Sequence, residues 1–176
     1  RHYRYVGLRI HPPPAQSGGP PLVVTGRRTA AMRRAAIRGD GWMPYLYSPE
    51  RYARSVQTIT ELAAADGRSL RDFLWMAYVM VAVDPDPDTA RERAARFLGM
   101  TYSRDFTEIV DRVTVTGTAE VVTNRLRDFV QAGARHLVLL PCVDRERGSS
   151  PGSEPWWTDL LSELRGASHT PGATKA

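Results

Sequence analysis

Residues 20–42, PPLVVTGRRTAAMRRAAIRGDGW, decide the fold of this chain. Residues 22–24 are a short β-rich stretch preceded by two prolines, and Gly26 stands where the chain must leave that strand. An Arg/Ala-rich helix follows, and the run Gly-Asp-Gly-Trp at 39–42 begins the next strand. A strand, a helix and a second strand in this order are the repeating step of a parallel α/β fold.

The turn at residues 25–29 is a candidate anion site. A turn of this kind directs backbone N–H groups beyond the end of the strand, where the helix dipole also favours negative charge. Arg27 and Arg28 add two fixed cations beside the same place, so a phosphate is the natural ligand. The alternative is that both arginines are solvated residues of the first helical turn, because one glycine before a helix is a weak motif.

Helices and strands continue to alternate after residue 42. Ser48, Pro49 and Glu50 predict a helix start, and the apolar run 73–83 predicts a strand covered on both faces. Further helices are expected after the Asp/Pro run 84–88, ending near residue 100, weakly over 105–113, and from the cap at 117–120 to Gly133. Residues 136–141 predict the last strand, which gives four strands in all.

Length and composition fit one globular domain. The 176 residues are 42% hydrophobic and 24% charged, and the longest apolar run, 73–83, is too short to span a bilayer. The first residues lack the order of a signal peptide, so we expect a cytoplasmic protein without membrane contact. The single cysteine, Cys142, excludes an internal disulfide, and its position at a strand end favours an ordinary thiol over a nucleophile.

Positive charge is spread along the chain. The formal net charge is +5, and all but one of the 24 basic residues are arginines that alternate with acidic residues in the expected helices. Nucleic-acid-binding proteins usually gather such residues on one face and interleave aromatic side chains, so we do not expect a nucleic-acid partner. A binding role for the densest patch remains the alternative, and its members are Arg27, Arg28, Arg33, Arg34 and Arg38.

Other familiar motifs are missing or have ordinary explanations. The sequence holds no Gly-x-Ser-x-Gly, His-Glu-x-x-His or Walker motif, and its four histidines do not have metal-ligand spacings. Asp84, Asp86 and Asp88 alternate like the start of a calcium loop, but the prolines between them favour a helix start. No metal site is therefore expected.

Two sets of strand residues have both a functional and a structural interpretation. Asp40 is a carboxylate after a glycine at a strand start, and a hydrogen bond to nearby backbone is the favoured role. The aromatic residues Trp42, Trp75 and Tyr78 could line a ring pocket, whereas packing in the core is the ordinary role of large aromatics on such strands.

Residues 20–56 followed by residues 117–141 resemble the C-terminal half of the luciferase-like monooxygenase family. That superfamily contains flavin- and coenzyme F420-dependent oxidoreductases with a TIM-barrel fold. The likeness covers roughly residues 5–165, and its most specific parts are the Gly-Asp-Gly-Trp step with Ser48, Pro49 and Glu50 behind it and the segment 117–141. It implies an α/β fold that forms the C-terminal half of a (β/α)8 TIM barrel, with about four parallel strands and flanking helices.

The same resemblance implies a cofactor-binding site. In the family the fifth strand ends in two glycines and a small hydroxyl residue, and this turn holds the cofactor phosphate at a helix N-terminus. Here Thr25 stands in place of the first glycine, Gly26 matches the second, and Arg27 matches an arginine common in one subgroup. Arg28 takes the hydroxyl position and either replaces the hydroxyl by a charge or turns outward and leaves Thr29 to serve.

The resemblance also implies how the chain is organised. Residues 1–19 are an extended, proline-rich connection from a missing N-terminal half, residues 20–165 form the half-barrel, and residues 166–176 are expected to be disordered. A last helix is expected over 155–165. Residues that meet the flavin or deazaflavin ring come largely from the first four strands, so catalytic residues are not assigned. Without an initiating methionine, the chain is interpreted as a fragment or truncated product.

The expected function is therefore part of a flavin- or F420-dependent oxidoreductase or monooxygenase acting on a small organic substrate. With FMN the enzyme would activate dioxygen, and with F420 it would transfer a hydride; the arginine pair favours F420, whose tail carries carboxylates. The segment would supply the phosphate site and be inactive alone, and its partner would be the missing N-terminal half-barrel or a second copy in a homo-oligomer. The alternative is a non-catalytic module that binds a phosphate ligand or a partner.

Overall fold

The structure of this chain is a computed structural model that describes residues 4–9 and 11–143. The N-terminal connection holds no helix or strand in its described part. The expected last helix at 155–165 and the tail at 166–176 lie outside the described residues.

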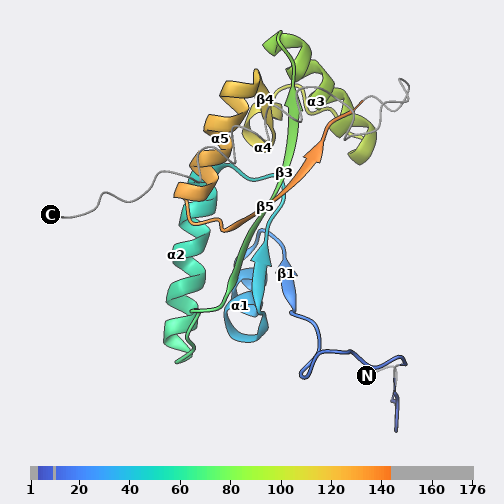
Figure 1. The fold of residues 1–176 in the computed structure, drawn as a ribbon, viewed down its shortest axis with the longest axis vertical. Coiled ribbons are helices and arrows are strands. Elements are labelled where there is room, and N and C mark those ends of the chain that lie inside the picture. Colours follow the sequence, from blue (N-terminus) through green and yellow to red (C-terminus); the bar gives the residue numbers. More distant parts are fainter. Residues whose placement is uncertain (1–3, 10, 144–176) are drawn as a thin grey trace, which may run out of the picture.

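Strands and helices alternate along most of the described chain (Figure 1). The strands are β1 (Val23–Thr25), β2 (Gly41–Met43), β3 (Leu74–Val83), β4 (Val115–Gly117) and β5 (His136–Pro141). The helices are α1 (Thr29–Arg38), α2 (Pro49–Ala65), α3 (Pro87–Tyr102), α4 (Val110–Val113) and α5 (Ala119–Gln131). Every strand pair is parallel, so the carboxyl ends of the strands lie at one edge of the sheet.

The long strand β3 organises the sheet. Tyr78 pairs with Tyr45 on one side and with Val138 of β5 on the other. Val81 pairs with β4 and also with β5. Since each residue has two edges, β2 and β4 follow one another along one edge of β3, and β5 occupies the other. β1 extends the sheet beyond β2.

Two details differ from the sequence expectation. The sheet has a fifth strand, β4, whose residues Val-Thr-Gly form no apolar run and directly precede the cap of α5. The helix expected over 105–113 is only the four-residue α4, because the carboxylate of Asp105 accepts the N–H of Thr107 at 2.8 Å and holds a turn instead. The other helices and strands expected within the described residues are confirmed.

Three helix starts follow the capping rules read from the sequence. The hydroxyl of Ser48 accepts the N–H of Arg51 at the start of α2, with Pro49 at the first helical position. The carboxylate of Asp86 accepts the N–H of Asp88 at the start of α3, so the Asp/Pro run is a helix start as predicted. Thr118 caps α5 in the same manner.

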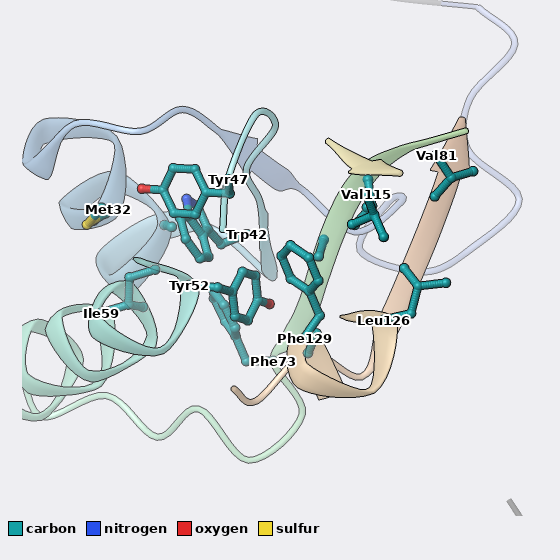
Figure 2. Close-up of a cluster of buried hydrophobic side chains, with 14 of the residues drawn as sticks. Met32, Trp42, Tyr47, Tyr52, Ile59, Phe73, Val81, Val115, Leu126 and Phe129 are labelled. Atoms are coloured by element: carbon teal, nitrogen blue, oxygen red, sulfur yellow. The ribbon is translucent and has the colours of Figure 1, made fainter. Parts of the chain in front are cut away.

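One face of the sheet is covered by α1, α2 and α5, and this packing forms the main core (Figure 2). The indole of Trp42 is fully buried, with its ring centre 5.3 Å from that of Tyr52 and 5.7 Å from that of Tyr47. β3 contributes the alternate residues Ala77, Val79, Val81 and Val83 to this side. The helices contribute buried residues that include Met32, Tyr52, Ile59, Ala63, Val122, Leu126 and Phe129.

Within the part of the chain that the structure describes, α3 and the segment that follows it cover the opposite face near the carboxyl ends of the strands (Figure 1). Met80 and Ala82 pack there against Leu98 and Phe106. Cys142 joins this cluster directly after β5, and burial raises its pKa to about 12, so the thiol stays protonated at neutral pH. The interpretation of Cys142 as an ordinary thiol therefore fits its surroundings.

The lower part of this opposite face is uncovered within the described residues. Side-chain alternation and strand register place five half-buried apolar residues there, all outside both core clusters: Val23, Met43, Leu74, Met76 and Val138. We call these residues the open face. Among the described residues, the second half of 73–83 is covered on both faces, as expected, and the first half is covered on one face.

Candidate functional site

The turn between β1 and α1 lies at the carboxyl edge of the sheet. Gly26 has a φ of +126°, and a Cβ atom at this position would lie 2.7 Å from the Cβ of Ala31. A side chain there would be strained by its backbone conformation and would collide with the first turn of α1. Glycine therefore allows the chain to pass from strand to helix with the backbone close to the helix start.

Neighbouring elements hold the carbonyl groups of this turn. The indole Nε1 of Trp42 donates a hydrogen bond to the Gly26 carbonyl at 3.0 Å. The guanidinium of Arg51, in the first turn of α2, donates to the Arg27 carbonyl at 3.5 Å and lies 4.4 Å from the ring centre of Tyr47. Residues of β2 and α2 thus hold the turn by its carbonyl groups, and these contacts do not use its backbone N–H groups.

The start of α1 has no partner from its own sequence. Arg28 occupies the N-cap position and makes no capping hydrogen bond, and the first turn contains no acidic residue. Among the described residues, nothing accepts the backbone N–H groups of Thr29 and Ala30. Free donors with a positive helix end behind them suit an anion with several oxygens, so a phosphate group fits this place.

The side chains of Arg27 and Arg28 differ in their contacts. The guanidinium carbon of Arg27 lies 5.3 Å from the ring centre of Tyr45. The Arg28 side chain is exposed and meets no partner within the described part of the chain. The hydroxyl of Thr29 is exposed as well and makes no hydrogen bond to a described residue. Arg28 and Thr29 are both free to approach a ligand, and both alternatives from the sequence stand.

The remaining arginines of the dense patch lie on the outer side of α1. Arg33, Arg34 and Arg38 are exposed, while Ala31, Met32, Ala35 and Ala36 face the core. This is the ordinary pattern of an amphipathic helix with a solvated charged face. Nothing in the arrangement favours a nucleic-acid interface.

Asp40 lies at the opposite, amino-terminal end of the strands. Its carboxylate accepts the backbone N–H of Leu22 at 2.8 Å and lies 4.0 Å from the guanidinium of Arg68. Arg68 in turn donates to carbonyl groups at the end of α1, with the shortest contact, 2.6 Å, to Gly39. Asp40 therefore has the backbone-binding role that the sequence favoured and takes no part in the candidate site.

The aromatic residues named from the sequence divide between the two faces. Trp42 is part of the main core and supports the turn, and Trp75 packs against Phe73 with ring centres 4.6 Å apart. Tyr78 lies on the opposite face. Two more aromatic residues reach the carboxyl edge without having been singled out. Tyr45 is the second residue after the end of β2, a position that can be recognised in the sequence, whereas Tyr102 reaches this edge only through the packing of α3.

Helix α2 starts at the same edge, and Glu50 in its first turn forms an ion pair with Arg125. The hydrogen bond from Ser48, a backbone N–H and a hydrogen bond from Arg125 together lower the pKa of Glu50 to about 2. Arg125 lies 2.9 Å from Glu50 and 3.0 Å from Asp128, which links α2 to α5. The acidic residue in this first helical turn thus occupies the place that an external anion would need.

The described chain has neither a group of metal ligands nor a helix that could span a membrane. Within residues 4–9 and 11–143, histidine, cysteine and acidic side chains do not gather in groups of three or more that could hold a metal ion. In the same residues, no helix has the length and apolar character needed to cross a membrane.

The family is decided by a match between residues 1–136 and the model of the luciferase-like monooxygenase family. The chain belongs to this family. No curated protein sequence matches it significantly. The family expected from the sequence is therefore confirmed.

Solved structures show the same fold. An F420-dependent secondary alcohol dehydrogenase superposes with a TM-score of 0.64 at 19% identity, covering 82% of this chain and 47% of that one. The EDTA monooxygenase of Chelativorans sp. BNC1 gives 0.63 at 15% identity, covering 94% and 50%. A riboflavin lyase with modified FMN gives 0.59 at 16% identity, covering 90% and 46%. The chain spans about half the length of these luciferase-like enzymes, and the expected α/β, TIM-barrel-type fold is confirmed.

Proposed function

We propose that this chain forms the C-terminal half of a luciferase-like barrel and that its turn at residues 25–29 holds the phosphate of coenzyme F420 or FMN. The observation that carries the proposal is the start of α1, which is uncapped, free of acidic residues and directly behind Gly26 at the carboxyl edge. In barrels of this type the chemistry lies at that edge.

Each residue of the turn has a role in this proposal. The missing side chain of Gly26 lets the phosphate approach the backbone, and the N–H groups of Thr29 and Ala30 donate to its oxygens. Arg28 or the Thr29 hydroxyl adds a further donor. Thr25 ends the strand, and Arg27 borders the site with its guanidinium turned to Tyr45.

The bound cofactor supplies the redox chemistry, which is hydride transfer for F420 and dioxygen activation for reduced FMN. The protein acts on a small organic substrate at the same edge. The arginines around the turn favour F420, since its tail adds carboxylates to the phosphate. In this proposal the chain contributes cofactor binding, and the residues that meet the cofactor ring come from strands that complete the barrel.

The open face supports completion of the barrel by further strands. Its five half-buried apolar residues would be buried by a second sheet half, as the inner faces of parallel strands normally are. Within the described residues, β1 pairs only with β2 and β5 pairs only with β3, so each has an edge for another strand. An N-terminal half-barrel of the same family is the proposed partner, on the same or a separate chain.

A cofactor titration of the intact protein from its host tests this function. Fluorescence titration with F420 and with FMN is expected to show saturable binding of one of them. Arg34→Gln, which removes an exposed arginine of α1 that has no side-chain partner among the described residues, should leave the affinity unchanged. If neither cofactor binds, the proposed function is wrong and the non-catalytic alternative takes its place.

A further inference from the structure

Four side chains from separate segments come together near the carboxyl edge of the sheet, on the same face as α3. They are Arg27 from the turn after β1, Tyr45 from the loop after β2, Tyr78 from β3 and Tyr102 from the end of α3. We call this group the tyrosine cluster.

The positions of the cluster follow from backbone pairing and ring contacts. Tyr45 and Tyr78 are direct partners in a parallel bridge, which is fixed by a 3.1 Å hydrogen bond from the Tyr78 N–H to the Pro44 carbonyl. Arg27 lies over the ring of Tyr45. Partial burial and the nearby phenols of Tyr45 and Tyr78 raise the pKa of Tyr102, and Arg27 acts in the opposite direction. The ring contact and the backbone bridge thus join Arg27, Tyr45 and Tyr78 in space, and the direction of the Tyr102 pKa is consistent with a phenol near them.

The polar groups of the cluster are not committed to the fold. In the described part of the chain, the phenol oxygens of Tyr45, Tyr78 and Tyr102 form no hydrogen bond, and no carboxylate pairs with Arg27. The tyrosines of the main core behave differently, since Tyr52 donates to the Met76 carbonyl at 3.1 Å and Tyr47 bonds Ser55 at 3.2 Å. Buried tyrosine hydroxyls normally find such partners, whereas those of the exposed Tyr45 and Tyr102 remain available to a ligand.

The cluster is also open to a ligand. Tyr45 is 37% exposed and Tyr102 is 40% exposed, which is high for large aromatic side chains. The ring of Tyr102 is held by Phe106, with ring centres 5.6 Å apart, so it has a defined position. The exposed side chains of Tyr45 and Tyr102 are therefore accessible to a ligand, and Arg27 lies beside Tyr45.

We propose that the tyrosine cluster binds the substrate of this protein and that the substrate is an aromatic carboxylate. This inference rests on the proposed function, because the cluster borders the cofactor turn through Arg27. The guanidinium and the phenol hydroxyls donate to the carboxylate, since all of them can donate and none has another acceptor in the described chain. The ring faces of Tyr45 and Tyr102 favour a flat unsaturated body over a branched aliphatic one.

Isothermal titration of the intact, cofactor-loaded protein with benzoate and with benzamide tests this proposal. The two probes have the same shape and differ in charge, so their affinity ratio isolates the contribution of the carboxylate. We expect benzoate to bind at least about tenfold more tightly than benzamide, as charge-assisted hydrogen bonds imply.

Two variants and one control locate this preference. Arg27→Gln should bring the benzoate-to-benzamide ratio close to one, and Tyr102→Phe should weaken benzoate about three- to tenfold while keeping the ring on Phe106. Arg34→Gln carries the same loss of charge on the outer side of α1 and should keep the full ratio.

The outcomes separate this inference from the proposed function. Cofactor binding by the unmodified protein, Tyr102→Phe and Arg34→Gln reports that they are folded and that the phosphate site is present, and thermal unfolding reports the folding of Arg27→Gln, whose residue borders the cofactor turn. Cofactor binding together with equal or absent binding of the two probes would overturn the tyrosine cluster as a carboxylate site. Loss of the ratio in Arg34→Gln would also overturn it, because the effect would then be one of general charge.

Discussion

The starts of α1 and α2 lie at the same edge of the sheet and differ in whether their first backbone N–H groups have an acceptor. At α2, Ser48 caps the helix and Glu50 supplies a negative charge that Arg125 pairs. At α1, the N-cap is Arg28, no acid is present, and the first N–H groups have no acceptor among the described residues. The sequence caps the start of α2 with its own residues and leaves the first N–H groups of α1 without an acceptor in the described chain.

This difference teaches where to look for function in a fold of repeated strands and helices. A capped helix start contributes to stability and repels a further anion, whereas an uncapped one gives up stability that a bound anion restores. Substitutions that exchange the two designs should therefore move stability and cofactor affinity in opposite directions.

The largest effect is expected for Gly26→Ala. Its new Cβ would meet Ala31 at 2.7 Å in a left-handed backbone conformation, which should cost about 1–3 kcal/mol of unfolding free energy and weaken cofactor binding. Gly99→Ala is the matched control, because its Cβ would have only an ordinary 3.5 Å contact, with the carbonyl oxygen of Arg104 just after α3. Denaturant unfolding of both variants checks the difference, and equal stability of the two would show that the turn does not require glycine.

Capping α1 should separate stability from binding. Arg28→Asp places a good N-cap acceptor at the free N–H groups and should raise the unfolding free energy by about 1 kcal/mol. The same carboxylate would occupy and repel the phosphate position, so cofactor affinity should fall at least about tenfold. Thermal unfolding and fluorescence titration of one preparation measure both. A variant that binds the cofactor as tightly as the unmodified protein would contradict the role of this helix start.

Uncapping α2 should give the reverse pattern. Ser48→Ala removes the hydroxyl that accepts the N–H of Arg51 and should cost about 1 kcal/mol of unfolding free energy. Cofactor affinity should stay within about twofold, because the start of α2 contacts no ligand in the proposal and the lost hydrogen bond is a single local contact. A large loss of affinity with unchanged stability would mean that α2, and not α1, borders the cofactor.

The smallest effect concerns acid. The pKa of Glu50 is lowered from 4.5 to about 2, so its charged form stabilises the fold above about pH 4.5, and this contribution is lost as the pH falls towards 2. Since the pair is exposed, its contribution is about 1 kcal/mol or less. Denaturant midpoints measured between pH 7 and pH 2 should show a stability gap between the unmodified protein and Glu50→Gln that closes with acid. Glu61→Gln serves as a surface control, and the same closing gap there would remove the assignment to Glu50.

Local chemistry in the sequence was enough for most of the fold. The capping residues Ser48 and Asp86 and the apolar run 73–83 have consequences within a few residues, and they mark helices and strands that the structure contains. β4 was not expected because its residues Val-Thr-Gly form no apolar run and lead directly into a helix cap, and its pairing with Val81, Ala82 and Val83 is set by tertiary contact.

The candidate site was only partly accessible from the sequence. Gly26 and the absence of an acidic residue in the first turn of α1 are visible in the local sequence, and they are enough to select this turn as a candidate site. The different contacts of Arg27 and Arg28 cannot be read from the sequence, because Arg27 lies over the ring of Tyr45, a residue from the loop after the neighbouring strand. Tyr102 is 57 residues from Tyr45 along the chain, and only the return of α3 over the sheet brings them close.

The most direct test of the phosphate site compares the cofactor with its phosphate-free form. Affinities for FMN and riboflavin, or for F420 and the deazaflavin alcohol without phosphate, give a ratio that reports the phosphate alone. The intact protein and Ser48→Ala should both prefer the phosphorylated form by at least about tenfold, and Arg28→Asp should lose this preference. An equal preference in Arg28→Asp, or none in the unmodified protein, would show that the start of α1 does not hold the phosphate.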